Sequence, residues 1–114
     1  MKILLVDANL CFSEVIRKCV MASFPDAEVD SVPNHFAAEA FVEKYGPYDF
    51  VVIENILPYC HGVELAETLN KHAGVKNATI VWSFHPVDGV TQKPAKRIEI
   101  ERAVLGLSER CNAG

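Results

Sequence analysis

The sequence predicts an α/β fold, in which a doubly wound parallel sheet carries helices on both faces. Three short apolar runs rich in β-branched or aromatic residues have the length of buried strands, at Ile3–Val6, Phe50–Ile53 and Thr79–Trp82. Segments with helical periodicity separate these runs. A chain that alternates strand and helix forms a parallel sheet, because each right-handed crossover returns the next strand in the same direction.

Length and composition favour a single folded domain over residues 1–114. The chain is 50% hydrophobic and 23% charged, which suits one core but leaves too little chain for two ordinary domains. Eleven Lys and Arg stand against fifteen Asp and Glu, for a net charge of −4, and no basic block occurs. Nucleic acid is therefore not expected as a partner.

The N-terminus and the cysteines indicate the compartment. A short apolar run is interrupted by Asp7, so neither a signal peptide nor a membrane span is expected. The four cysteines include no CxxC pair. We therefore expect a soluble, cytoplasmic protein with reduced thiols.

The first crossover is expected to contain one helix, followed by an edge strand. Asn9 caps the start of this helix, and Pro25 prevents its continuation. Its apolar residues follow helical spacing: Phe12, Val15, Ile16, Cys19 and Val20. The run Ala27–Val32 partly alternates between apolar and polar residues, which favours a strand near the sheet edge with one less covered face.

Two more helices are expected before the strand at Thr79–Trp82. The first covers His35–Tyr45, with Asn34 as its cap and the Gly46-Pro47 pair as its stop. The second begins near Gly62 and ends before Gly74. Its apolar face comprises Leu65, Ala66, Leu69 and Ala73.

The end of the chain departs from this alternation. Only six residues separate Ser83 from Val90–Gln92, whereas a parallel crossover needs about a dozen or more. A fourth helix is therefore expected to be absent. We favour a shortened connection to a rudimentary fifth strand over an irregular segment. The return through Pro86–Gly89 would then be tight, with an antiparallel direction as one option. A last helix begins near Pro94, with these residues in register: Ile100, Ala103, Val104, Leu107 and Cys111.

Polar residues follow the ends of four predicted strands. Asp7 ends the first strand, and Glu54 follows Phe50–Ile53. Ser83 and Lys93 come after the last two strand candidates. The carboxyl ends of parallel strands open onto one crevice, where ligands usually bind. We therefore expect two carboxylates, a hydroxyl and an ammonium to converge there, with the ammonium offsetting the repulsion between the acids.

At these positions the sequence resembles the receiver domain of bacterial two-component response regulators. The segment Ile3–Asp7 is similar to the first strand with its acidic end, and Val51–Leu65 to the third strand and phosphoacceptor loop. Val81–Ser83 is similar to the fourth strand with its switch hydroxyl, and Lys93 with the following proline to the Lys-Pro pair. The likeness is good over 1–84 and partial beyond.

The resemblance implies a fold, a process and a partner. The spacing of Glu54, Pro58 and Gly62 is its most specific part. It implies a flavodoxin-like, CheY-like sheet of about five strands that functions in two-component signalling or a phosphorelay. A histidine kinase or a downstream signalling protein is the implied partner. Because no output domain follows the last helix, we expect the output to pass through a separate protein or through self-association.

Three departures from the family pattern indicate an atypical receiver, or pseudo-receiver. Glu54 stands at the phosphoacceptor position, where the family has Asp. The acidic pair after the first strand is Asp7-Ala8, so one carboxylate is missing, and His61 replaces the loop Asp. Mg²⁺ needs hard oxygen ligands in tight octahedral geometry. We therefore expect no cofactor, weak or absent Mg²⁺ binding, and no Asp phosphorylation.

Each of these site residues has two interpretations. Glu54 either mimics the charge of an aspartyl phosphate while paired with Lys93, or serves only as a structural ion-pair partner. Asp7 is either a residual metal ligand or a capping acid. Ser83 is either a switch hydroxyl or a group satisfied by backbone. Trp82 is interpreted as core, with a partner anchor as the alternative.

Weaker signals point to other functions. Cys60-His61 lacks a second Cys/His pair at zinc-finger spacing. A nucleophilic Cys60 would need His61 or His85 as its base, at a hydrogen-bond distance that the sequence does not show. The rival to a non-enzymatic signalling domain is an enzyme or small-ligand binder with Asp7, Glu54 and Lys93 in the crevice. A flavin at that crevice rests on analogy of fold alone.

A homodimer is also expected. Loss of the fourth helix should expose apolar surface near Trp82, Phe84 and Val90, and a second copy would cover it.

Overall fold

The computed structural model describes residues 1–77, 79–83, 90–94, 99, 102, 103, 106 and 109. Five strands form one sheet in the order β2-β1-β3-β4-β5, and every neighbouring pair is parallel. The strands are β1 (Lys2–Val6), β2 (Glu28–Val32), β3 (Phe50–Glu54), β4 (Ile80–Ser83) and β5 (Thr91–Gln92). The predicted doubly wound α/β fold is confirmed, with its topological switch point between β1 and β3.

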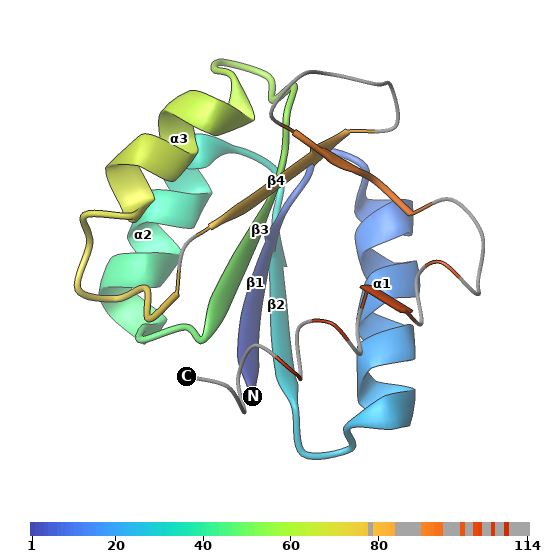
Figure 1. The fold of residues 1–114 in the computed structure, drawn as a ribbon. Helices are drawn as coiled ribbons and strands as arrows, with labels where there is room; N and C mark the ends of the chain where they lie inside the picture. Colours follow the sequence, from blue (N-terminus) through green and yellow to red (C-terminus); the bar gives the residue numbers. More distant parts are fainter. Residues whose placement is uncertain are drawn as a thin grey trace.

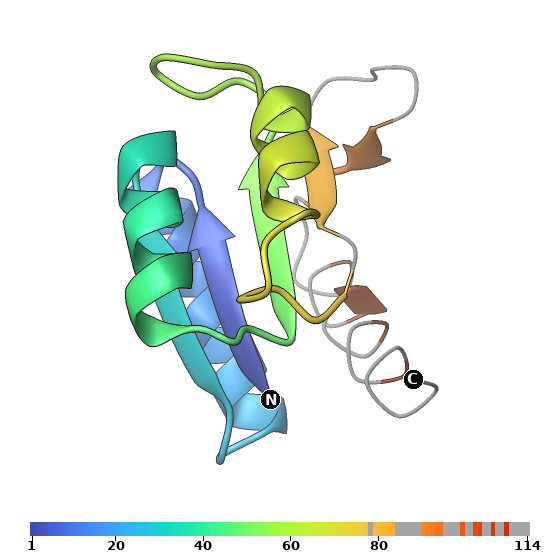
Figure 2. The same cartoon turned by 90° about the vertical axis from the view of Figure 1, so that its left-hand side faces the viewer.

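Helices cover both faces of this sheet. Helix α1 (Leu10–Ser23) lies on one face, and α2 (His35–Tyr45) and α3 (Gly62–Leu69) lie on the other (Figures 1 and 2). The alternation of side chains along β1 divides the core accordingly. Ile3 and Leu5 pack in the cluster under α1, while Leu4 and Val6 pack in the cluster under α2 and α3.

The predicted caps start the first two helices. The Asn9 side chain accepts a hydrogen bond from the Phe12 backbone N–H at 3.0 Å, and the Asn34 side chain accepts one from the Ala37 N–H at 2.9 Å. Each bond satisfies a donor that the first helical turn would otherwise leave without a partner. Among the described helices, α1 and α2 therefore begin where the sequence predicts.

The third helix is shorter than predicted. It ends at Leu69 rather than before Gly74, because the following residues form turns. The His72 N–H donates to the Leu69 carbonyl at 3.0 Å, and the His72 ring accepts from the Gly74 N–H at 2.9 Å. A Cβ at Gly74 would lie 2.6 Å from the Val42 carbonyl oxygen, so this turn packs directly on α2. Strands β2 and β4 each begin one residue later than predicted, and β4 also ends one residue later, at Ser83.

The last strand is rudimentary, as predicted, and of the directions left open for it the structure has the parallel one. The two residues of β5 pair parallel to β4, with Trp82 opposite Thr91 and Ser83 opposite Gln92. The predicted absence of a fourth helix falls on residues 84–89, which lie outside the described residues. The predicted last helix also falls largely outside them. Its described positions are helical: Glu99, Arg102, Ala103, Gly106 and Glu109.

Within the described ranges, no helix combines the length and the apolar character needed to cross a bilayer.

Candidate functional site

Backbone hydrogen bonds hold Asp7 and Lys93 just beyond the carboxyl ends of their strands. The Asp7 N–H donates to the Val32 carbonyl at 3.0 Å. The Lys93 N–H donates to the Ser83 carbonyl at 2.6 Å, which continues the pairing of β5 with β4. The sequence therefore positions these residues through strand length and register, before any side-chain contact is made.

The ammonium of Lys93 lies between the two predicted carboxylates. Its Nζ is 2.5 Å from Asp7 Oδ2 and 2.8 Å from Glu54 Oε2. The side chains of Lys93 and Asp7 are only 2% and 7% exposed, and that of Glu54 is 16% exposed. A buried charge is stable only when it is paired, so each of these groups depends on the others.

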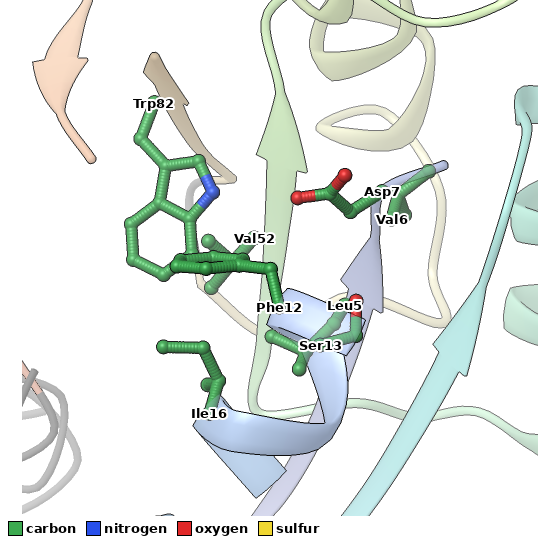
Figure 3. Close-up of a pocket in the computed structure, with 8 residues that line it drawn as sticks. All are labelled: Leu5, Val6, Asp7, Phe12, Ser13, Ile16, Val52 and Trp82. Atoms are coloured by element: carbon green, nitrogen blue, oxygen red, sulfur yellow. The ribbon is translucent and has the colours of Figure 1, made fainter. Parts of the chain in front are cut away.

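An aromatic ring completes the surroundings of Lys93. The Nζ atom lies 4.0 Å from the centroid of the Phe12 ring, within the range of a cation–π interaction. Phe12 in turn meets Trp82 edge-on, with ring centroids 5.8 Å apart and an interplanar angle of 74°. Figure 3 shows the two rings packed together beside Asp7. Sequence reasoning used Phe12 only as a core position of α1, and no sequence signal links it to Lys93.

Asp7 uses both of its carboxylate oxygens within the chain. Oδ2 accepts from Lys93, and Oδ1 accepts from the Asn9 backbone N–H at 2.8 Å. The second contact is a local turn bond at the entrance to α1. These contacts favour the interpretation of Asp7 as a capping and charge-balancing acid over that of a residual metal ligand.

Trp82 is 7% exposed and packs in the core cluster under α1. The interpretation of Trp82 as a core residue is therefore confirmed, and the Phe12 ring packs against it. Of the apolar surface expected near this residue, Val90 is half-buried, and Phe84 lies outside the described residues. The homodimer stays a prediction.

Ser83 is 3% exposed at the end of β4, beside the strand that leads into Lys93. The structure places it at the same sheet edge as Asp7 and Glu54. Its role as a switch hydroxyl stays a prediction.

The loop after β3 is held by a close approach that only glycine permits. The Gly62 N–H donates to the Asn55 carbonyl at 2.6 Å, and a Cβ at position 62 would lie 2.4 Å from the Glu54 carbonyl oxygen. Ile56 and His61 form an antiparallel bridge inside this loop. The spacing of Glu54 and Gly62 in the sequence therefore has a steric cause, since the start of α3 rests on the end of β3.

A small pocket lies beneath Asp7, between α1 and the sheet (Figure 3). Its walls are Leu5, Val6, Asp7, Phe12, Ser13, Ile16, Val52 and Trp82. The space between these side chains is too narrow for a water molecule. The small-ligand alternative receives no support from this pocket.

The Cys60-His61 pair shows no feature of a reactive or metal site. Burial, followed by the charges of Glu64 and Glu39, raises the pKa of the Cys60 thiol, which lowers the thiolate fraction that a nucleophile requires. Among the residues that the structure describes, no three His, Cys, Asp or Glu side chains group to hold a metal ion.

Similar proteins share this arrangement of strands and helices. The response regulatory domain of protein mrkE from Klebsiella pneumoniae superposes with a TM-score of 0.80 over 100% of both chains, at 14% identity. The phosphorylated cyanobacterial phytochrome response regulator RcpA gives a TM-score of 0.77 at 20% identity, over 95% of this chain and 91% of that one. A CheY-like response regulator receiver domain protein from Methanospirillum hungatei gives 0.73 at 20% identity, over 99% and 98%.

The chain has the fold of CheY-like receiver domains. In sequence, this receiver-fold chain is 26% identical to Stress response regulator protein 1 of Lodderomyces elongisporus over 80 residues, which are 70% of this chain. The match spans only 22% of that relative's length. No protein-family profile matches the chain.

A receiver resemblance implies Mg²⁺ at these strand ends, and the residues present do not fit it. Mg²⁺ demands near-octahedral oxygen ligands and takes one or two carboxylates as anchors. Here Ala8 provides no carboxylate, and the Lys93 ammonium contacts both Asp7 and Glu54. A divalent cation between these two acids would have to displace a buried positive charge.

Proposed function

We propose that this chain is a pseudo-receiver: a non-enzymatic signalling domain that acts by contact with a protein partner, without phosphorylation of an aspartate and without a required Mg²⁺ ion. The receiver fold supports the general class. The position of the Lys93 ammonium between Asp7 and Glu54 supports the atypical part.

In this proposal the Lys93 ammonium takes the place that a bound Mg²⁺ ion has in phosphoryl transfer. Phosphoryl transfer needs a positive charge that neutralises the phosphate oxygens and an acceptor oxygen that is free to attack. Lys93 supplies positive charge, but its hydrogen bond occupies the Glu54 carboxylate at 2.8 Å. A glutamate that already holds this lysine is a poor phosphate acceptor, and the pair fixes one arrangement of the site.

In this proposal the contact with a partner does not depend on phosphorylation at position 54. A carboxylate carries one negative charge and lacks the three oxygens of a phosphoryl group, so it reproduces an aspartyl phosphate only in part. We propose that the Glu54–Lys93 pair holds the strand ends in a single state, with the structural ion pair as its physical basis. Charge mimicry of a phosphorylated state is the competing interpretation.

Replacement of Glu54 by Gln separates the two interpretations. Gln keeps the length and an acceptor oxygen but removes the charge. Backbone amide chemical shifts of Ser83 and Lys93 report on the strand ends. The proposal predicts reduced stability and shift changes limited to the contacts of Glu54. A second, slowly exchanging set of resonances at the ends of β4 and β5 would contradict the proposal and favour mimicry.

A matched control uses an acid in an exposed ion pair. Glu14 contacts Arg17 at 2.5 Å on α1, and both side chains are more than a third exposed. The Glu14→Gln variant should leave the Ser83 and Lys93 resonances unchanged. If it alters them as Glu54→Gln does, the response is general to charge removal and the experiment does not support a role for Glu54.

A further inference from the structure

A second pocket lies at the opposite end of the sheet from the strand-end site. It is an open pocket of about 370 Å³, lined by Lys2, Glu28, Asp30, Phe41 and Tyr45. The residues come from the start of β1, from the edge strand β2 and from the second half of α2. Figure 2 shows α2 in front of these two strands. The receiver-type function proposed above makes no use of this pocket.

The charge available in the pocket is negative. Glu28 and Asp30 stand two residues apart on β2, so both side chains project from the same face of the sheet. The Asp30 Oδ2 atom accepts from the Tyr48 hydroxyl at 2.6 Å. Within the described residues, no hydrogen bond or ion pair engages the Glu28 carboxylate.

Lys2 does not neutralise these acids by contact. Its Nζ donates to the backbone carbonyl of Tyr45, at the end of α2, and lies 4.9 Å from the centroid of the Tyr48 ring. No ion pair joins Lys2 to Glu28 or Asp30 in the part of the chain that the structure describes. Two carboxylates against one engaged ammonium leave the pocket suited to a cation.

Aromatic rings form the remaining wall. Phe41 and Tyr45 pack with their centroids 5.0 Å apart and their planes at 67°. Phe41 is half-buried, while Tyr45 is 43% exposed and offers ring surface to solvent. A ring wall beside carboxylates suits a cation with a flat or apolar body.

We propose that this pocket binds a guanidinium group, presented by an arginine in an extended segment of a partner protein. Guanidinium is weakly hydrated, stacks on aromatic rings and donates in a planar fork to carboxylates, which a compact ammonium does not. A hard divalent ion would require more oxygen ligands than two carboxylates supply.

The unpaired edge of β2 is the reason why we propose an extended segment of the partner. Among the described strands, β2 pairs only with β1, so its other edge presents backbone donors and acceptors. An added strand would bind through these groups and place alternate side chains on the face that carries Glu28 and Asp30. An arginine on that strand would reach the pocket while its backbone pairs with β2.

Titration of the intact chain with blocked model compounds tests the proposal by NMR. The probes are N-acetyl-arginine methylamide and the same blocked forms of citrulline and lysine. Citrulline has nearly the shape of arginine but no charge. We expect saturable shifts at the amides of Glu28, Asp30 and Tyr45 with the arginine compound, weaker binding of the lysine compound, and no saturation with citrulline. Equal affinities for arginine and citrulline, or shifts elsewhere only, would overturn it.

Variants with altered pocket acids provide the second measurement. Glu28→Gln and Asp30→Asn should each weaken binding about two-fold to five-fold, the range of a partly exposed charge pair. Asn at position 30 keeps an oxygen for the Tyr48 hydroxyl, and the exposed Glu28 site allows a test that leaves the core unchanged. Glu43→Gln, an exposed acid of α2 outside the pocket, should leave the affinity unchanged.

A blocked extended peptide with a central arginine identifies the source of the guanidinium. It should bind more tightly than the single blocked residue and should protect β2 amides from hydrogen exchange. Equal affinity without protection would contradict the partner segment and would assign the pocket to a free guanidino compound.

Discussion

Lys93 and Phe12 come from opposite ends of the chain and meet at the strand-end site, with the ammonium 4.0 Å from the ring centroid. The ring therefore belongs to the site as much as the two carboxylates do. Because Phe12 also packs edge-on against Trp82, the charge cluster and the core under α1 are joined through one side chain.

Loss of the buried ammonium should destabilise the fold strongly. Lys93→Met leaves the carboxylates of Asp7 and Glu54 without their shared partner, at an expected cost of about 3–5 kcal/mol in the free energy of unfolding. Urea denaturation followed by circular dichroism measures the change. Lys76→Met, which removes an exposed partner of Asp49, should cost at most about 1 kcal/mol. Similar losses in both variants would contradict a structural role for the buried cluster.

Removal of the Phe12 ring should expose Trp82 to more solvent. Phe12→Leu keeps apolar volume but loses the cation–π contact, worth about 0.5–2 kcal/mol. Because the chain has a single Trp, its fluorescence reports this position directly. We expect lower stability together with a red-shifted emission as the indole gains solvent. An unchanged emission spectrum would show that Phe12 does not cover Trp82 in solution.

The loop after β3 should reject even one added methyl group. Gly62→Ala forces a Cβ toward the Glu54 backbone carbonyl, and relief requires movement of the backbone, at about 1–3 kcal/mol or more. Gly106 is a matched control, because among the described residues no atom lies within 4 Å of a Cβ built there. Thermal denaturation should show Gly106→Ala to be neutral or stabilising. A Gly62→Ala variant as stable as the parent would disprove the close approach.

Asp49 should contribute stability that disappears in acid. Burial acts to raise the pKa of its carboxyl, but the Lys2 N–H and the Lys76 ammonium outweigh burial and lower it. A lowered folded-state pKa gives stabilisation that is complete above the unfolded pKa, about 4, and is lost as pH falls through the folded value. The difference in unfolding free energy between the parent and Asp49→Asn should therefore shrink below about pH 4. A difference that grows in acid would contradict this linkage.

Much of the fold follows from local sequence features. The caps at Asn9 and Asn34 are strong signals because they satisfy backbone donors in the first turn of each helix. The apolar runs of β1 and β3 are strong signals because strands buried on both faces are almost continuously apolar. The direction of β5 could not be predicted, since two residues carry no periodicity. The end of α3 was misjudged because the turn after Leu69 depends on packing against α2, which spacing alone does not encode.

The strand-end site was predictable in its charged members but not in its contacts. Asp7, Glu54 and Lys93 follow strand ends, and parallel topology brings such residues together. The sequence contains no sign that Phe12 lies beside Lys93, or that Asp7 also receives the Asn9 N–H.

Incubation with acetyl phosphate and Mg²⁺, followed by intact mass measurement, shows whether Glu54 accepts a phosphoryl group. A double variant that combines Ala8→Asp with Glu54→Asp restores the acidic pattern of the family and serves as the positive control. The account predicts that the parent chain keeps its unmodified mass under conditions that phosphorylate this variant. A phosphoryl adduct on the parent that maps to Glu54 would contradict it.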